Sequence, residues 1–167
     1  PVGLPTVTID ATADASVRRS APDTNFAAEA QLLGDGGGQE VGDASHALIY
    51  LRFPLTEVPG RAVMAKLRLR THDGSNSQSA DAGGLHVVED PWEEATVTYA
   101  DRPPPGEMVG TLGAVALGQV CERVLLIDLR ARAEVSLVIV PTSVDGAIFC
   151  ARESAFAPQL IVAYEPE

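Results

Sequence analysis

Short β-prone segments, each bounded by turn-forming residues, recur about every ten residues along this chain, and this spacing restricts its fold more than any other feature. Residues 63–70 show the pattern most clearly, because every second side chain there is apolar, beginning with Val63. Since successive side chains of a strand point to opposite faces, one set is predicted to face a core and the other to face solvent. The inward set is Val63, Ala65, Leu67 and Leu69, and the outward set is Met64, Lys66, Arg68 and Arg70.

The expected strands are residues 6–10, 13–18, 46–53, 62–71, 84–89, 96–99, 109–117, 120–128, 135–140, 147–151 and 159–164. Helix is expected only as short turns over residues 25–33 and 128–134, with Asn25 and Asp128 as N-cap residues. Alternating strands without intervening helices are typical of antiparallel sheets rather than of a parallel α/β fold. We therefore predict an all-β fold, an antiparallel, jelly-roll-like β-sandwich of about ten or eleven strands.

The length and charge of the chain exclude several classes of protein. A chain of 167 residues, 46% of them apolar, is sufficient for one domain with its own core, so residues 1–167 are taken as a single domain. No membrane insertion is expected, because the apolar runs are far shorter than the roughly 20 residues that a membrane-spanning helix requires. The net charge of −11 argues against nucleic acid as a partner, since phosphates are bound by an excess of Lys and Arg.

The two cysteines, Cys121 and Cys150, both lie in β-prone segments. A zinc site needs four ligands, and His46, His72 and His86 show no paired metal-binding spacing with the cysteines. Two possibilities remain, buried free thiols or a disulfide across neighbouring strands, and the disulfide is slightly favoured.

Residues 90–106 combine the only tryptophan of the chain, Trp92, with the strand expected at residues 96–99 and with three consecutive prolines. The prolines cannot donate backbone hydrogen bonds, so the chain is expected to leave the sheet there. Trp92 could offer its face to a sugar ring. A lone tryptophan beside a β-prone run is more often part of a core, and Trp92 is expected to close the sandwich.

Four separated parts of the chain resemble one family when they are taken in order. They are residues 13–18 (ADASVR) with 22–26 (PDTNF), residues 50–53 (YLRF), residues 92–103, and residues 143–146 (SVDG) with 151–153 (ARE) and 157–160 (APQL). Together they resemble the DNRLRE domain, also classed as carbohydrate-binding module family 96. The chain departs from the usual pattern at Ser16, Ala27 and Tyr99, where the family frequently has an aromatic, a glycine and a tryptophan, and this counts against a sugar-stacking role there.

The resemblance implies a non-catalytic β-sandwich that is secreted or held at the cell surface of bacteria or archaea. Such domains occur beside polysaccharide-degrading enzymes and in envelope or coat proteins, and some bind acidic polysaccharides such as alginate. The leading hypothesis is therefore a carbohydrate-binding module that attaches a larger protein or surface assembly to a polysaccharide. The alternative is a structural or adhesive protein of a coat, matrix or appendage, whose partner would be a cell-surface protein.

Cationic side chains are the first candidates for binding an acidic polysaccharide. Lys66, Arg68 and Arg70 alternate along one strand and are expected to form a carbohydrate-binding strip, although acidic neighbours on adjacent strands could neutralise them. Guanidinium groups can also grip carboxylates through paired hydrogen bonds. For the arginines inside the family-like motifs, the expected role is to pin loops by binding carbonyls and carboxylates; these are Arg52, Arg102 and Arg152.

A structural calcium ion is a further expectation, because oxygen-bearing side chains gather in several loops. The leading ligand group is Asp14, Asp23 and Asn25. Two other groups are Asp35, Glu40 and Asp43, and His72, Asp73, Asn76 and Asp81. Asp, Asn and Gly are also the residues that turns require.

No catalytic function is expected. Glu93 and Glu94 could be suggested as the carboxylate pair of a glycosidase, but adjacent residues of an extended strand point to opposite faces and cannot flank one bond. The chain also has no nucleophile-elbow motif.

Overall fold

A computed structural model describes residues 3–167, and this part of the chain contains eleven β-strands and no helix. The strands are β1 (Thr6–Asp10), β2 (Ala13–Arg18), β3 (Gln31–Gly34), β4 (Ala47–Pro54), β5 (Gly60–Arg70), β6 (Gly84–Val87), β7 (Met108–Thr111), β8 (Val120–Leu125), β9 (Glu134–Val140), β10 (Ala147–Cys150) and β11 (Gln159–Pro166). Within residues 3–167 there is no helix with the length and hydropathy needed to cross a membrane.

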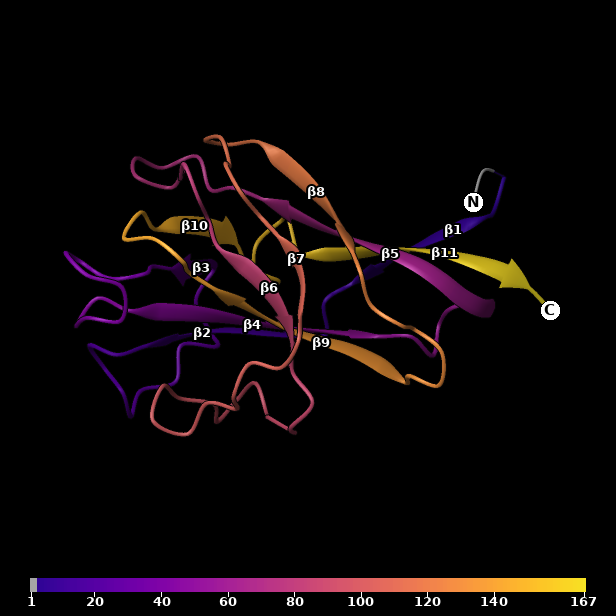
Figure 1. Ribbon diagram of the computed structural model, residues 1–167, viewed down its shortest axis with the longest axis horizontal. Helices are drawn as coiled ribbons and strands as arrows, with labels where there is room; N and C mark the ends of the chain where they lie inside the picture. Colours follow the sequence, from indigo (N-terminus) through magenta and orange to yellow (C-terminus); the bar gives the residue numbers. More distant parts are fainter. Residues whose placement is uncertain (1–2) are drawn as a thin grey trace.

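The strands form two main antiparallel sheets, with the orders β1-β11-β5-β8 and β2-β4-β9-β6-β7. The short strands β3 and β10 pair with each other, and single bridges join them to Ala47 at the start of β4 and to Thr71 at the end of β5. In Figure 1 the first sheet occupies the upper and right part of the molecule and the second lies below it, while both chain ends are at the right. The prediction of an all-β, antiparallel sandwich is confirmed.

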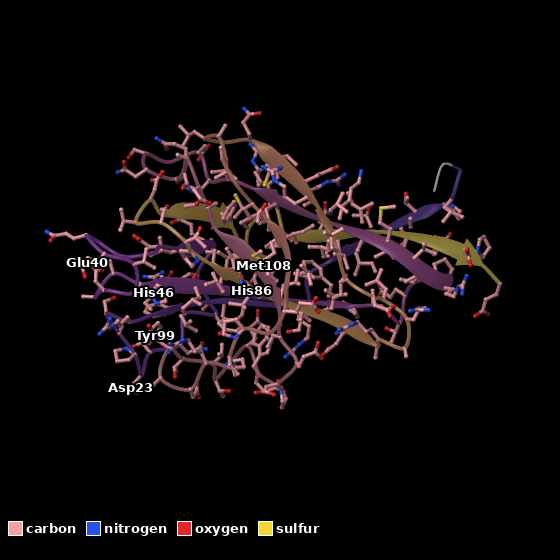
Figure 2. All side chains as sticks on the ribbon, in the orientation of Figure 1. Asp23, Glu40, His46, His86, Tyr99 and Met108 are labelled. Atoms are coloured by element: carbon pink, nitrogen blue, oxygen red, sulfur yellow. The ribbon has the colours of Figure 1, made fainter. Side chains whose placement is uncertain are left out.

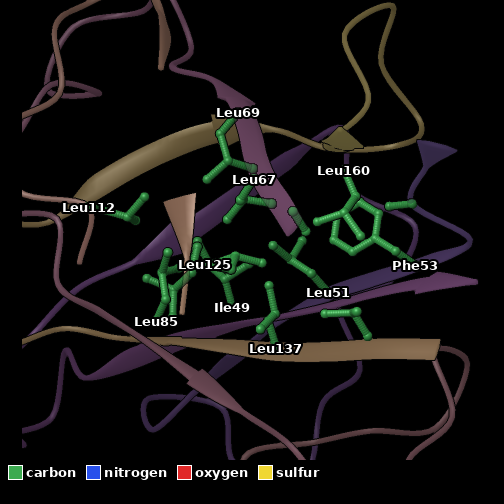
Figure 3. Packing of buried hydrophobic residues seen from close by; sticks show 14 of the residues in the cluster. Ile49, Leu51, Phe53, Leu67, Leu69, Leu85, Leu112, Leu125, Leu137 and Leu160 are labelled. Atoms are coloured by element: carbon green, nitrogen blue, oxygen red, sulfur yellow. The ribbon is translucent and has the colours of Figure 1, made fainter. Parts of the chain in front are cut away.

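The main core lies between the two sheets. Leu67, Leu69 and Leu160 of the first sheet pack toward Ile49, Leu51, Phe53 and Leu137 of the second, as Figure 3 shows. Each of these side chains is at most 1% exposed. Burial of large aliphatic side chains at about 1.5–3 kcal/mol each is the main force that holds the sheets together.

The outer face of the five-stranded sheet is also buried over β2, β4 and β9, which a two-layer sandwich does not require. Tyr50 and Val138 point to this face and are fully covered by Trp92, Val97 and Val88. The Tyr50 hydroxyl donates a hydrogen bond to the Pro103 carbonyl at 2.6 Å, so the proline segment is fixed over the sheet. Strands β4 and β9 are therefore buried on both faces, and this explains their nearly continuous apolar sequences.

The strand predicted at residues 96–99 is wrong. Residues 94–96 form a turn, and the amide of Val97 donates to the Glu93 carbonyl at 2.9 Å instead of to a neighbouring strand. Val97 is buried because the turn places it on Tyr50 and Trp92, so its apolar character serves the second core rather than a sheet. An alternation of apolar and polar residues over only four positions does not distinguish a strand from a turn whose apolar residues are buried.

Both predicted helical turns are also wrong. Residues 31–34 form β3, and Asn25 uses its side-chain amide to bind the carbonyls of Glu94 at 2.8 Å and Val97 at 2.9 Å instead of capping a helix. Asp128 accepts a hydrogen bond from the amide of Arg130 at 3.0 Å, but the chain then enters β9 without a helical turn. The strand predicted at residues 109–117 is shorter in the structure, because β7 ends at Thr111. Among residues 112–117 only Val115 forms a bridge, to Ser79.

A β-bulge changes the facing of one residue in β5. Ala65, Leu67 and Leu69 are buried as predicted, but Val63 is 36% exposed. The pairing of β5 with β11 shifts between Ala163 and Tyr164, so Val63 has no direct partner and leaves the alternation. The prediction that Val63 faces the core is wrong for this reason.

Cys121 and Cys150 are free thiols in the structure, so the slightly favoured disulfide is not formed. Cys150 is buried and Cys121 is half-buried. Burial raises the pKa of both thiols above the ordinary value of 9.0, which keeps them protonated at neutral pH.

Candidate functional site

A row of polar side chains crosses the outer face of the four-stranded sheet. Arg68 on β5 lies directly opposite Glu122 on β8 and Gln159 on β11, and Gln159 lies opposite Asp10 on β1. The guanidinium of Arg68 donates to Glu122 at 2.8 Å and to Gln159 at 3.1 Å, and the amide of Gln159 donates to Asp10 at 2.8 Å. Neutralisation by neighbouring strands, the alternative considered above, therefore holds for Arg68.

A groove of about 320 Å³ lies beside this row, between the end of β5 and the loop that precedes β11. Arg70 lines it and has no hydrogen bond or ion pair within residues 3–167. Its guanidinium instead lies over the ring of Phe156, 4.0 Å from the ring centroid. The charged and aromatic residues that line the groove are Asp10, Arg68, Arg70, Arg152 and Phe156. Arg68 and Arg152 form ion pairs with carboxylates outside the groove, whereas Arg70 forms none within residues 3–167.

The third member of the predicted strip is placed differently. Lys66 lies between Val124 of β8 and Ile161 of β11 in the sheet register, and it lines a separate depression with Thr6 and Met64. Lys66 has no ion pair within the described part of the chain. The structure thus brings Arg68 and Arg70 to one groove, while Lys66 points from the same outer face two residues away.

Arg152 connects the groove to a cluster of carboxylates at one end of the sandwich. Its side chain donates to the Thr12 carbonyl at 3.1 Å and lies 3.4 Å from carboxylate oxygens of both Glu94 and Glu153. Its backbone amide donates to Asp14 at 2.8 Å. These contacts confirm the loop-pinning role expected for Arg152.

Asp14, Glu94 and Glu153 each place a carboxylate oxygen within 4.8 Å of the other two. Asp14 comes from β2, Glu94 from the turn that follows Trp92, and Glu153 from the loop after β10. Burial raises the pKa of Asp14 to about 7, and the charges of Glu153 and Glu94 add to this effect, while the hydrogen bond from the Arg152 amide opposes it. Burial is thus the main reason that the charged form of Asp14 is disfavoured, and the neighbouring carboxylates are a smaller contribution.

The predicted calcium ligands Asp14, Asp23 and Asn25 have different surroundings. Asp23 is exposed and lies among the loops at the lower left of Figure 2. The amide nitrogen of Asn25 binds two carbonyls, and its oxygen accepts from the amide of Ala27 at 3.2 Å, so its polar atoms serve the loop. Asp14 instead lies beside Glu94 and Glu153. Glu153 occurs in a family-like motif, but no pattern in the sequence indicates that it lies beside Asp14, more than a hundred positions earlier.

The other two oxygen-rich groups show turn-type contacts. The exposed carboxylate of Asp43 accepts hydrogen bonds from the amides of Gly38, Gln39, Glu40 and Ser45, at distances between 2.6 and 3.3 Å. Asp81 accepts from the amide of Gly83 at 3.2 Å and from the Thr142 hydroxyl at 3.0 Å. Both carboxylates hold loops together.

The remaining motif residues are also structural. The guanidinium of Arg52 lies 4.4 Å from the ring centroid of Trp92 and binds the Trp92 carbonyl, and Arg102 donates to the Tyr99 carbonyl at 2.7 Å. Trp92 is 5% exposed, and its indole nitrogen donates to Ser136 at 2.8 Å. The expectation that Trp92 closes the sandwich is confirmed, and both arginines pin the loop that carries it.

The outer face of the four-stranded sheet of this β-sandwich thus carries a groove lined by three arginines, and a fold of this kind does not by itself define a function. Comparison with protein families assigns the class. The model for carbohydrate-binding module family 96 matches residues 5–164, and the chain belongs to this family. The resemblance seen in the sequence is thereby confirmed. A search among curated proteins found no match.

Proposed function

We propose that this carbohydrate-binding module binds an acidic polysaccharide along the outer face of its four-stranded sheet. The observation that supports this most directly is Arg70, a groove-lining cation that has no ion pair within residues 3–167 and is held over Phe156. A guanidinium presents a planar pair of donors that matches a carboxylate. A uronic acid unit in the groove would supply that carboxylate.

Phe156 adds an apolar surface to the groove. Its side chain is 49% exposed although one face carries the Arg70 guanidinium. The rest of the ring can contact the C–H face of a sugar, as aromatic residues commonly do when they combine apolar area with defined geometry. Lys66 lies farther along β5, and a strand rises by roughly 7 Å for every two residues. A polymer chain that follows the strand would therefore reach Lys66.

In this proposal the domain performs no chemistry and acts outside the cell, where it attaches a larger protein or assembly to the polysaccharide. The positions of the chain ends are compatible with such attachment. Both ends leave the molecule at the right in Figure 1, whereas the row from Asp10 to Gln159 marks the other end of the β1–β11 pair. A connection at either end would leave the groove accessible.

The test is isothermal titration calorimetry, in which the chain is titrated separately with a polyuronate and with a neutral glucan of similar length. The polyuronate is expected to bind, the neutral glucan is not, and affinity is expected to fall as NaCl screens the charges. Arg70→Ala should weaken binding most, Arg68→Ala less, and Lys66→Ala least. Arg61→Ala is the matched control, because Arg61 lies at the far end of β5 and pairs with Glu165. Equal binding of both polymers, or an equal loss with Arg61→Ala, would contradict the proposal.

A second candidate function is a protein–protein contact of a coat or appendage, and one observation favours it. Strand β8 is the edge of its sheet and exposes Val120 and Val124, while Leu126 just beyond it is 80% exposed. Exposed apolar side chains gathered at a strand edge are typical of contact surfaces. Sedimentation equilibrium would show concentration-dependent self-association that Leu126→Ser removes.

A further inference from the structure

Three carboxylates that are remote in sequence meet at one end of the sandwich. Asp14, Glu94 and Glu153 lie within 4.8 Å of one another, measured between one oxygen of each. Asp14 and Glu94 are 80 positions apart, and the Glu94 carboxylate accepts a hydrogen bond from the Asp14 amide at 3.1 Å. Asp14 is buried, Glu94 is half-buried and Glu153 is an exposed residue, and the side chains of the two glutamates are 24% and 25% exposed.

Each of the three carboxylates has one oxygen that is occupied by the protein. Oδ2 of Asp14 accepts from the Arg152 amide, Oε1 of Glu94 accepts from the Asp14 amide, and Oε1 of Glu153 faces the Arg152 guanidinium. These contacts fix the orientation of the three groups. The second oxygen of each carboxylate makes no hydrogen bond within residues 3–167, so three oxygens remain for a ligand.

The oxygen of Asp14 that remains is the most informative of the three. Asp14 is 1% exposed, and its Oδ1 is buried without a hydrogen-bond partner among the described residues. A buried polar atom of this kind is costly, because it has lost water and gained no partner. Native structures rarely keep one unless another group satisfies it.

The charge of the cluster is also unbalanced. Three carboxylates face one guanidinium, that of Arg152, which leaves two negative charges when all three are ionised. We propose that Asp14, Glu94 and Glu153 bind a divalent cation, and that the cation is calcium. It would satisfy Oδ1 of Asp14 and balance both charges at once.

Calcium fits the donor set better than the other common metal ions. All three ligands are hard carboxylate oxygens, and the site contains neither histidine nor cysteine, which zinc prefers. Calcium accepts six to eight oxygens in irregular geometry and can complete its shell with water, whereas magnesium demands a near-ideal octahedron. The proposal keeps Asp14 from the group expected from the sequence and replaces Asp23 and Asn25 by Glu94 and Glu153.

A cation at this place would join β2 to the Trp92 loop and to the loop after β10. It would therefore stabilise the folded chain, since the unfolded chain does not bring the three carboxylates together. This inference does not depend on the identity of the polysaccharide. It predicts an effect on stability in the absence of any sugar.

The test uses the intact chain after dialysis against EDTA and then against chelator-free buffer. Titration with CaCl2 in a calorimeter is expected to show one site per chain. A calcium concentration of about 100 times Kd should raise Tm by roughly 5 °C or more. Glu153→Gln and Glu94→Gln should each weaken calcium binding on the order of tenfold, because each removes one ligand charge. Magnesium at the same concentration should have a smaller effect.

Asp23→Asn is the matched control, because Asp23 is an exposed acidic residue of the ligand group expected from the sequence. It should leave calcium binding unchanged. Because Asp14→Asn could impair folding, Glu153→Gln serves as the decisive variant, with its circular dichroism and its calcium-free Tm measured first. The proposal is overturned if roughly 10 mM CaCl2 gives neither heat nor a Tm shift. It is equally overturned if binding survives Glu94→Gln combined with Glu153→Gln, or is lost in Asp23→Asn.

Discussion

The guanidinium carbon of Arg70 lies 4.0 Å from the ring centroid of Phe156, and this contact holds a cation in place over an exposed groove. The two residues come from different parts of the chain, since Arg70 ends β5 and Phe156 belongs to the loop between β10 and β11. An aromatic face attracts a cation without neutralising its charge. Arg70 is thus oriented but remains able to bind an anion.

Phe156→Ala is expected to weaken binding of the polyuronate by about two- to fivefold, the equivalent of the 0.5–1 kcal/mol typical of an exposed cation–π contact. The loss has two sources, the greater freedom of Arg70 and the missing apolar surface. Calorimetry with the polyuronate measures it. Phe156→Tyr keeps the ring and should bind like the parent chain, and a large loss with Tyr would contradict the role assigned to the ring.

Trp92 and Ser136 are expected to contribute to stability as a pair. The indole nitrogen donates to the Ser136 hydroxyl at 2.8 Å in the second core. Ser136→Ala should lower the free energy of unfolding by about 1–3 kcal/mol, because it leaves a buried N–H without a partner. Urea unfolding of the single and double variants forms the check. If Ser136→Ala together with Trp92→Phe costs the full sum of both single changes, the two residues do not interact.

Val63 and Leu67 both occupy the inward set of the β5 alternation, but the bulge separates their environments. Leu67→Ala should cost about 2–5 kcal/mol of unfolding free energy because it creates a cavity in the main core. Val63→Ala should cost less than about 1 kcal/mol because the side chain is already partly exposed. Thermal or urea unfolding of the two variants, compared under one condition, measures the difference. Similar losses for both would argue against the bulge.

The carboxylate of Asp43 should stabilise its loop in a pH-dependent way. Four backbone amides donate to it, first among them those of Gln39 and Gly38, and they lower its pKa well below the ordinary 3.8. Because the pKa is lower in the folded chain, the stabilisation is complete above about pH 4 and is lost as the pH falls further. The protection of residues 38–45 against amide hydrogen exchange, taken relative to the exchange rate of an unstructured peptide at the same pH, should therefore fall in acid. Asp43→Ala should show low protection at every pH, whereas unchanged protection in this variant would contradict the role.

The two cysteines should behave as thiols of unequal accessibility. The intact mass is expected to be the same before and after reduction, and two thiols per chain should react after unfolding. In the folded chain Cys121 should react before Cys150, since it is less buried, and both should react slowly because burial raises their pKa. A loss of two mass units before reduction would show a disulfide instead.

Several parts of the fold follow directly from local sequence. The spans of β1 and β2 agree with those expected, and Ala65, Leu67 and Leu69 face the core as their spacing predicts. This succeeds because a strand with one buried face imposes a period of two on its own residues. The cationic character of the β5 outer face follows from the same period.

Predictions from local sequence were wrong where a distant part of the chain decides the structure of a segment. Val97 alternates like a strand residue but lies in a turn that covers Tyr50, and residues 31–34 become a strand because β10 pairs with them. Val63 leaves the alternation because it is the extra, unpaired residue of a bulge in the pairing of β5 with β11. In each case the deciding neighbour is far away in the sequence, so no local pattern records it.

The sequence by itself determined that this protein is an antiparallel β-sandwich of a carbohydrate-binding family, with cations on one face of one strand. Only the tertiary structure decided which charged groups meet. It placed Arg70 over Phe156, paired Arg68 with Glu122, and joined Asp14 to Glu94 and Glu153. The physical reason is that side-chain periodicity is a local property, whereas strand order, register and loop anchoring depend on contacts between residues remote in sequence, such as Asp14 and Arg152, which are 138 positions apart.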